Sequence, residues 1–118
     1  MSTAAATEPL RVDLGNIVGV AARLLSGEGE GMKARREARL DSFDKEPHPI
    51  EIILPSTVIT ANSSFLRKFI RPSILELGVA AFREKYTFKG ANIDDDIEDE
   101  IRRAVLEMQP SADVRRVA

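Results

Sequence analysis

The chain of 118 residues contains no cysteine and no tryptophan, and it has only one tyrosine and one histidine. Because cysteine is absent, the protein has no disulfide, no thiol nucleophile and no cysteine ligand for a metal. No stretch approaches the roughly 20 apolar residues that a membrane-spanning helix needs. Residues 1–7 lack the positive start and the apolar core of a signal peptide. We therefore expect a soluble cytoplasmic protein.

Neither sign of charge is in large excess. The chain has 17 lysine and arginine residues against 19 aspartate and glutamate residues, for a formal net charge of −2. General affinity for nucleic acid needs a basic field, so this balance argues against it. The length predicts one domain, which we place at residues 10–108, between a flexible N-terminal tail at 1–9 and a flexible C-terminal tail at 109–118.

The stretch from Ile50 to Gly78 organises the predicted fold. Ile50–Leu54 is a β-branched run between prolines, which predicts a short buried strand. After the polar turn Asn62–Ser64, apolar residues recur at steps of three and four up to Gly78, which predicts a helix with a glycine cap. The stripe keeps its phase across Pro72, so we expect one kinked helix. One shared core is expected from Phe65, Phe69, Ile70, Ile97 and Ile101.

Further elements are predicted on both sides of this stretch. Alternation over Leu10–Leu14 and the strand formers Tyr86–Phe88 predict two more strands. Good helix formers over Met32–Phe43, with a thin apolar stripe of Met32, Ala34, Ala38, Leu40 and Phe43, predict one helix, and an apolar stripe over Ile93–Met108 predicts another. The order predicts an α/β fold, with a mixed sheet of about four strands covered by three to four helices. Parallel neighbours would be joined by right-handed crossovers.

The segment between the first strand and the first long helix gives mixed signals. Ile17–Leu25 carries several apolar residues, and its pattern is compatible with a strand, a helix or a turn. Ser26–Gly31 alternates glycine with glutamate, which predicts a flexible acidic loop. Its Gly27-x-Gly29-x-Gly31 spacing matches no phosphate-binding loop, and the two glutamates would repel phosphate.

The turn Asn62-Ser63-Ser64 is the most informative polar feature. Asparagine and serine lead the preferences for helix N-caps, so we favour a capping role for this turn. The functional alternative makes it a docking tip or a phosphoacceptor, with a phosphate placed on the free N–H groups of the following helix.

A second polar feature is a basic cluster of four residues on the predicted helix 32–43. A solvated helix face is the default interpretation, and the alternative is contact with an acidic protein surface or a phosphate-bearing ligand. The cluster consists of Lys33, Arg35, Arg36 and Arg39.

No constellation of catalytic or metal-binding residues stands out. The acidic run Asp94–Glu100 lacks the spacing of a calcium loop and is explained by the preference for anions at a helix N-terminus. His48 lies between two prolines, with no spacing that supports a serine–histidine triad. We expect no cofactor, no metal and no enzymatic activity.

The stretch Ile50–Met108 resembles the STAS-like domains, relatives of bacterial anti-sigma factor antagonists. The strand Ile50–Leu54 followed by Val58–Phe65 is similar to the family's strand, turn and serine pair. Leu75–Gly78 with Phe82 and Lys85 resembles its segment before the next strand, and Asn92 leads into a similar closing helix. Upstream, Arg23, Gly27 and Lys33-Ala34-Arg35 resemble a looser Arg–Gly–Arg signature, which adds Arg23 to the candidate anion-binding residues.

The resemblance implies a STAS-like layered fold and a regulatory role. In the antagonists a partner kinase phosphorylates the first serine of the turn, a role that would fall on Ser63. Asn62 stands where the antagonists have aspartate, and Phe65 stands where they have glycine. STAS-like domains accompany GHKL-type ATPase domains, which makes such an ATPase or kinase the implied partner.

Our first hypothesis is therefore a non-enzymatic interaction module with a contact surface at the turn and on the central helix. The alternative is a nucleic-acid-associated accessory protein that uses the basic helix Lys33–Arg39. A hydrolase using Ser63 or Ser64 would need a base that nothing in the sequence places, and a homo-oligomer is compatible with either hypothesis. The residues of the expected contact surface are Asn62, Ser63, Ser64, Arg67, Lys68 and Arg71.

Overall fold

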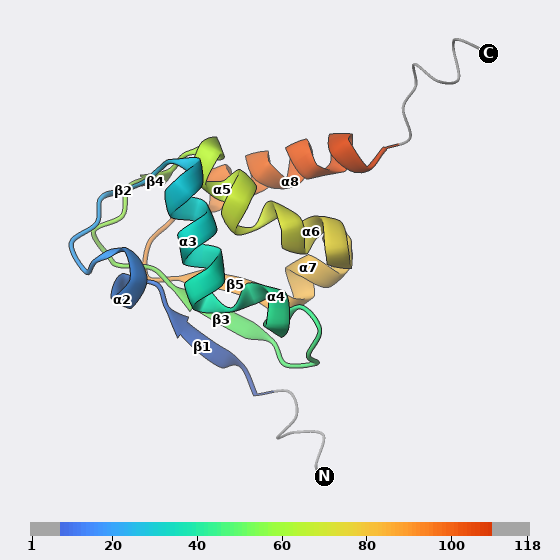
Figure 1. The fold of residues 1–118 in the computed structure, drawn as a ribbon, viewed down its shortest axis with the longest axis horizontal. Helices are drawn as coiled ribbons and strands as arrows, with labels where there is room; N and C mark the ends of the chain where they lie inside the picture. The colour runs from blue at the N-terminus through green and yellow to red at the C-terminus, as the bar shows by residue number, and fades with distance from the viewer. Residues whose placement is uncertain (1–7, 110–118) are drawn as a thin grey trace.

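The computed structural model describes residues 8–109, so the predicted tails fall largely outside it. Three parallel strands form the larger sheet in the order β1-β3-β5: β1 Leu10–Asp13, β3 Ile50–Ile53 and β5 Tyr86–Lys89 (Figure 1). Leu10 aligns with Ile50, which aligns with Tyr86. A second parallel pair joins β2 Leu24–Leu25 to β4 Thr60–Ala61.

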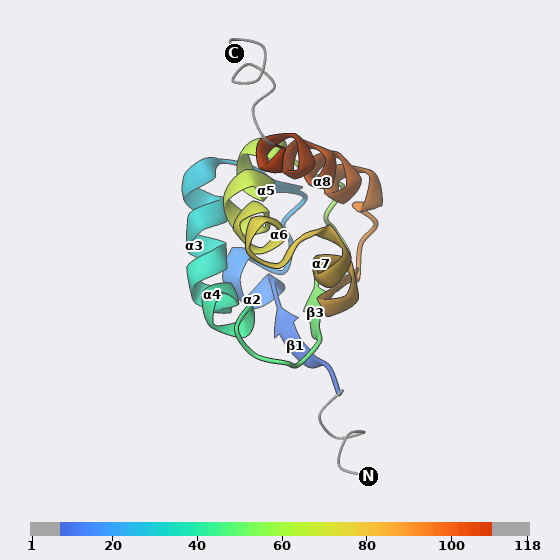
Figure 2. The same cartoon turned by 90° about the vertical axis from the view of Figure 1, so that its right-hand side faces the viewer.

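Helices α3 to α8 lie on one side of the larger sheet, with α3 packed against α5, and α8 packed against α5 and α6 (Figures 1 and 2). Within residues 8–109, no helix combines the length and the apolar character needed to cross a membrane. The helices are α2 Gly15–Val18, α3 Glu28–Ala38, α4 Leu40–Phe43, α5 Ser63–Phe69, α6 Arg71–Leu77, α7 Val79–Lys85 and α8 Asp94–Met108.

The predicted α/β class is confirmed, but the predicted sheet is wrong in its details. Residues 8–109 hold five strands in two sheets, and every pair is parallel, where one mixed sheet of about four strands was expected. The extra strands β2 and β4 have only two residues each, too few to show a period in the sequence. There are also seven helices in this range instead of three to four, because the helical stretches are interrupted.

Backbone geometry explains two of these interruptions. Arg39 has a left-handed conformation (φ 62°) and separates α3 from α4. Around Pro72 the expected kinked helix is two helices, because Ile70 ends α5 and also caps the start of α6. Pro72 lies in the first turn of α6, where its missing N–H would have no partner inside the helix anyway.

The predicted acidic loop at residues 26–31 is wrong from Glu28 onward. Glu28 begins α3, and Glu28 and Glu30 occupy its first turn, where the helix dipole favours negative charge. The glycines lower the intrinsic helix propensity of this turn, so its stability depends on packing. Gly31 is buried where α3 crosses α5.

The crossing of α3 and α5 predicts that Gly31→Ala destabilises the protein by about 1–3 kcal/mol. A Cβ at Gly31 would lie 2.3 Å from the backbone oxygen of Phe65, so the two helices would have to move apart. Urea denaturation followed by circular dichroism measures this loss. Gly29→Ala is the matched control, because a Cβ there meets nothing within 4 Å and alanine favours helix. Equal stability of the two variants would contradict the close crossing.

The predicted core is confirmed. Each of its five residues is buried, and Phe69 is only 1% exposed. On β3, Ile50 and Ile52 are fully buried, while the alternate residues Glu51 and Ile53 are only partly buried. Met32, expected on the apolar stripe of the basic helix, is instead 52% exposed. Ile93 is the N-cap of α8 rather than its first residue.

Candidate functional site

The predicted turn Asn62–Ser64 forms the N-cap and the first two residues of α5, and it is exposed at Asn62 and Ser63. Asn62 occupies the N-cap position with an extended backbone (φ −76°, ψ 156°), as the sequence predicts, but no side chain caps the first turn. Ser64 is partly buried, and its Oγ accepts a hydrogen bond from the backbone N–H of Gly27 at 3.1 Å. The prediction that the side chains of this turn cap the helix is therefore wrong. The Ser64 hydroxyl instead connects the turn to the residue before α3.

A small polar cleft of about 180 Å³ opens beside this turn, between α5 and α8. Asp96 of α8 forms part of its wall and accepts hydrogen bonds from Thr60 Oγ1 at 3.0 Å and from the Ala61 N–H at 2.9 Å. Asp96 thereby fixes β4 to α8, so the helix dipole alone does not account for the acidic run. The cleft is lined by Thr60, Ala61, Asn62, Ser63, Leu66, Asp96, Asp99, Glu100 and Arg103.

Arg71 does not belong to the exposed contact surface. Its side chain is only 16% exposed and forms ion pairs with Glu100 and Glu107 of α8. The hydrogen bond to Glu100 raises the pKa of Arg71 above its ordinary value. Glu100 is itself 1% exposed, and the sequence reading missed it. Its position in the sequence could have indicated this burial, because Glu100 precedes Ile101 and lies on the same buried face of α8.

The other two cations of the expected contact surface differ in their environment. Arg67 forms an ion pair with Glu28, and each side chain is about half exposed. This pair links α5 to the first turn of α3. Lys68 is partly buried beside a groove along α3. The turn and Lys68 therefore remain candidates for partner contact, whereas Arg67 is already engaged within the chain.

Arg35, predicted as an anion-binding residue on the basic helix face, is instead buried in an internal network. It is 8% exposed and donates to the Phe69 carbonyl and to Ser73 Oγ at 2.9 Å each. Its guanidinium also pairs with Asp41 at 2.8 Å and with Asp44 at 3.0 Å. Residues of α4 with its C-cap, of α5 and of α6 therefore converge on this side chain, which leaves no donor directed at an external ligand.

The network continues from Asp44 to β5. Ser73 Oγ donates to Asp44 Oδ2 at 2.7 Å, and the Tyr86 hydroxyl donates to Asp44 Oδ1 at 2.5 Å. Burial, and after it the hydrogen bond to Asp44, raises the pKa of Tyr86 above its usual range. The Asp44 side chain is 3% exposed, so these partners replace the water that would otherwise solvate its carboxylate. The network of Arg35, Asp44, Ser73 and Tyr86 therefore stabilises the fold by connecting α3, α4, α6 and β5.

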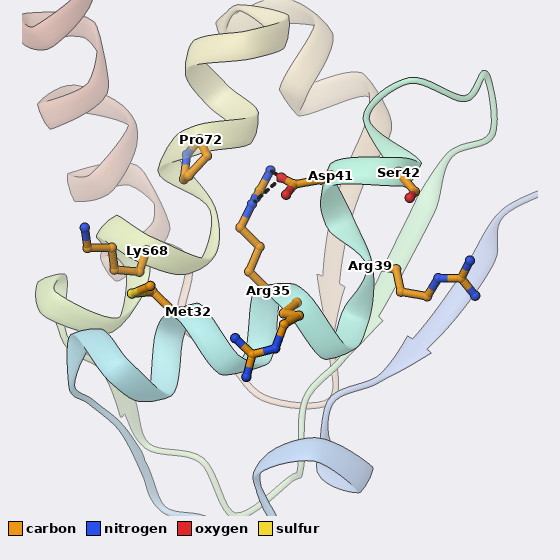
Figure 3. Close-up of a pocket in the computed structure, with 8 residues that line it drawn as sticks. Met32, Arg35, Arg39, Asp41, Ser42, Lys68 and Pro72 are labelled. Carbon is orange, nitrogen blue, oxygen red and sulfur yellow. Dashed lines mark hydrogen bonds and ion pairs between the residues drawn. The ribbon is translucent and has the colours of Figure 1, made fainter.

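Two of the remaining cations of the basic helix, Arg36 and Arg39, line a groove of about 490 Å³ between α3–α4 and α5–α6 (Figure 3). Arg36 and Arg39 are exposed there, and neither they nor Lys68 forms an ion pair with a carboxylate of residues 8–109. Lys33 is exposed on the same helix. The lining residues are Met32, Arg35, Arg36, Arg39, Asp41, Ser42, Lys68 and Pro72.

Arg23 does not line this groove. It is exposed just before β2, and its carbonyl accepts the Ile59 N–H at 2.8 Å. The structure therefore brings together three of the predicted cations, Arg36, Arg39 and Lys68, and separates Arg23 from them. Arg35 also lines the groove, but its guanidinium is bound within the internal network.

The only histidine serves the loop before β3. The carbonyls of His48 and Glu46 accept hydrogen bonds from Lys85 Nζ, which fixes this loop to α7. Burial lowers the pKa of Lys85. Across residues 8–109, no three or more His, Asp or Glu side chains are grouped so as to hold a metal ion.

Comparisons of this chain with protein-family models, with curated proteins and with solved structures found no match.

Proposed function

We propose that this chain is a non-enzymatic, STAS-like regulatory module that binds a partner protein, such as a GHKL-type ATPase or kinase, through the turn Asn62–Ser64. One observation carries the proposal. Ser63 is exposed at the mouth of the cleft between α5 and α8, so its hydroxyl is accessible to a partner or to a modifying enzyme. The residues that resemble the STAS-like domains, together with the α/β class of the fold, support the same function.

The local geometry suits a contact surface that is held in place by its surroundings. The Gly27–Ser64 hydrogen bond ties the turn to α3, and the hydrogen bonds of Asp96 to β4 tie the preceding strand to α8. A preorganised surface loses less conformational entropy when it binds. Asn62, Ser63 and the outer part of Lys68 would make the direct contacts.

If the turn is the contact surface, Ser63→Glu should weaken partner binding without changing the stability of the fold. This change should keep the melting temperature within about 2 °C of the parent, because an exposed surface substitution changes stability little. It should lower partner binding tenfold or more, because a new charge in the interface is repelled or left unpaired. The measurement is affinity capture with the tagged chain from cell lysate, quantified by mass spectrometry, beside thermal melts.

Two variants control this experiment. Ser63→Ala should keep both stability and capture, because it removes only an exposed hydroxyl. Ser56→Glu makes the same charge change at an exposed serine outside the turn and the cleft, and should leave capture unchanged. If Ser63→Glu captures the same proteins at the same level as the parent, the turn is not the docking surface.

A second candidate is the nucleic-acid-associated accessory protein, which is supported by the unpaired cations around the groove. Two features weigh against it. The formal net charge is −2, and the groove also presents apolar side chains, Met32 and Pro72, which a phosphate backbone would leave without a partner. The groove is better matched to a partner that combines negative charge with apolar side chains.

A further inference from the structure

The groove between α3–α4 and α5–α6 holds cations that the fold does not use. The other arginines of α5, α6 and α7 all form ion pairs: Arg67 with Glu28, Arg71 with Glu100 and Glu107, and Arg83 with Glu98. Arg36 and Arg39 form none with a carboxylate of residues 8–109 although they are exposed. In Figure 3 the labelled side chains form a strip from Met32 and Lys68 to Arg39 and Ser42. Positive charge is therefore available at both ends of the groove, with the Arg35–Asp41 ion pair between them.

The backbone of Arg39 gives a second, independent observation. It is the only non-glycine residue with positive φ in residues 8–109, at φ 62° and ψ 38°. Glycine adopts this left-handed conformation without strain, whereas a residue with a Cβ does not. Strained residues of this kind cluster at functional sites, because the side chain is retained in spite of its cost. Arg39 ends α3 and lines the groove.

The groove also has an apolar component. Met32 is 52% exposed at one end, and Pro72 of α6 lines the same cavity. Methionine adapts its shape to varied apolar partners. A free phosphate or a nucleic-acid backbone would use only the cations and would leave this apolar surface without a partner. An acidic peptide with apolar anchors uses both the cations and the apolar surface.

We propose that this groove binds an acidic amphipathic segment of a partner protein, with carboxylates on Arg36, Arg39 and Lys68 and an apolar side chain against Met32 and Pro72. The proposal shares with the proposed function the premise that the chain binds proteins. It uses a different surface, and only Lys68 is common to both.

A direct binding measurement tests the groove without a known partner. The probe is a fluorescein-labelled helical peptide of about 14 residues, rich in glutamate, with leucines at helical spacing on one face. Two companion peptides replace glutamate by glutamine or leucine by alanine, and a duplex DNA of about 20 base pairs serves as the nucleic-acid probe. Fluorescence anisotropy with the full chain at low salt gives each Kd.

The expected result is that the acidic amphipathic peptide binds best. Arg36→Gln combined with Arg39→Gln should weaken it tenfold or more, because each removes a charge-assisted contact. Arg39→Gly should weaken binding several-fold while the melting temperature stays constant or rises, because glycine relieves the left-handed strain. Arg102→Gln is the control with the same charge change, at an exposed arginine of α8 that does not line the groove, and should change Kd by less than about twofold.

Four results would overturn the proposal: no binding of the acidic peptide to the parent chain, equal binding of the leucine-free peptide, tighter binding of DNA, or an equal loss in Arg102→Gln. Ser63→Glu separates the two proposals. Peptide binding that survives this change supports the groove independently of the turn. Loss of lysate capture only in Ser63→Glu would place the partner at the turn.

Discussion

Arg35→Ala is expected to lower the free energy of unfolding by about 3–5 kcal/mol, because it leaves the buried Asp44 carboxylate without its cation. The Phe69 carbonyl also loses its donor from this side chain. Most domains have a total stability of about 5–15 kcal/mol, so this variant should be close to unfolding at physiological temperature. Urea denaturation followed by circular dichroism and by tyrosine fluorescence measures the loss.

The next residue in the sequence provides the control for this prediction. Arg36→Ala makes the same chemical change on an exposed side chain without an ion pair in residues 8–109, and should stay within about 0.5 kcal/mol of the parent. Adding Asp44→Ala to Arg35→Ala should cost less than the sum of the two single changes, because the pair is then removed together. Additive losses, or similar losses for Arg35→Ala and Arg36→Ala, would contradict the buried network.

Phe69→Ala is expected to cost about 3–5 kcal/mol. The ring is 1% exposed in the main core and packs on Phe65 with ring centroids 5.3 Å apart. Truncation removes this contact and leaves a cavity between helices that cannot fully close around it. The same denaturation experiment measures the effect.

Phe88 provides the comparison for the core prediction. It lies on β5, is only partly buried, and has its ring centroid 6.5 Å from that of Phe82. Phe88→Ala should therefore lose less stability than Phe69→Ala, because part of the ring already faces water. If the order were reversed, the main core would lie on the β5 side of the molecule rather than around α5.

The sequence predicted the elements whose own residues carry a clear period. Ile50–Ile53 and Leu10–Asp13 form strands, and α8 forms a long amphipathic helix, because burial on one face dictates the pattern of apolar residues. These elements need no information about their neighbours. For the same reason, the shared burial of Phe69 and Ile97 followed from the two helical stripes.

The phase of the basic helix could not be read in the same way. We took its apolar face to include Met32, Ala34 and Ala38. The two alanines are buried as predicted, but Gly31 and Arg35 share their face instead of Met32. Gly31 and the two alanines contribute little to a hydrophobic pattern, although their spacing allows close approach to another helix. Recognition of that spacing would have placed Arg35 inside and Met32 outside. The candidate groove was missed for the same reason.

The two-residue strands and the ion pairs between helices could not be predicted from the sequence either. β2 and β4 exist because their segments meet in space, and neither segment alone has strand character over a useful length. Arg71 and Glu100 are far apart in the chain, so nothing local identified them as partners. The exposure of Ser63 likewise depends on where α8 lies.

The parallel ladders also determine how the molecule can fold. Leu10 pairs with Ile50, Ile50 with Tyr86 and Leu24 with Thr60, so each ladder closes a loop of more than 30 residues before any sheet contact is made. Closure of such loops costs chain entropy that no early local contact offsets. Folding is therefore governed by high contact order and is slower than that of a helical bundle of similar length. During synthesis, β1 and β2 must wait for β3 and β4 to emerge, and the larger sheet is complete only after Lys89 has left the ribosome.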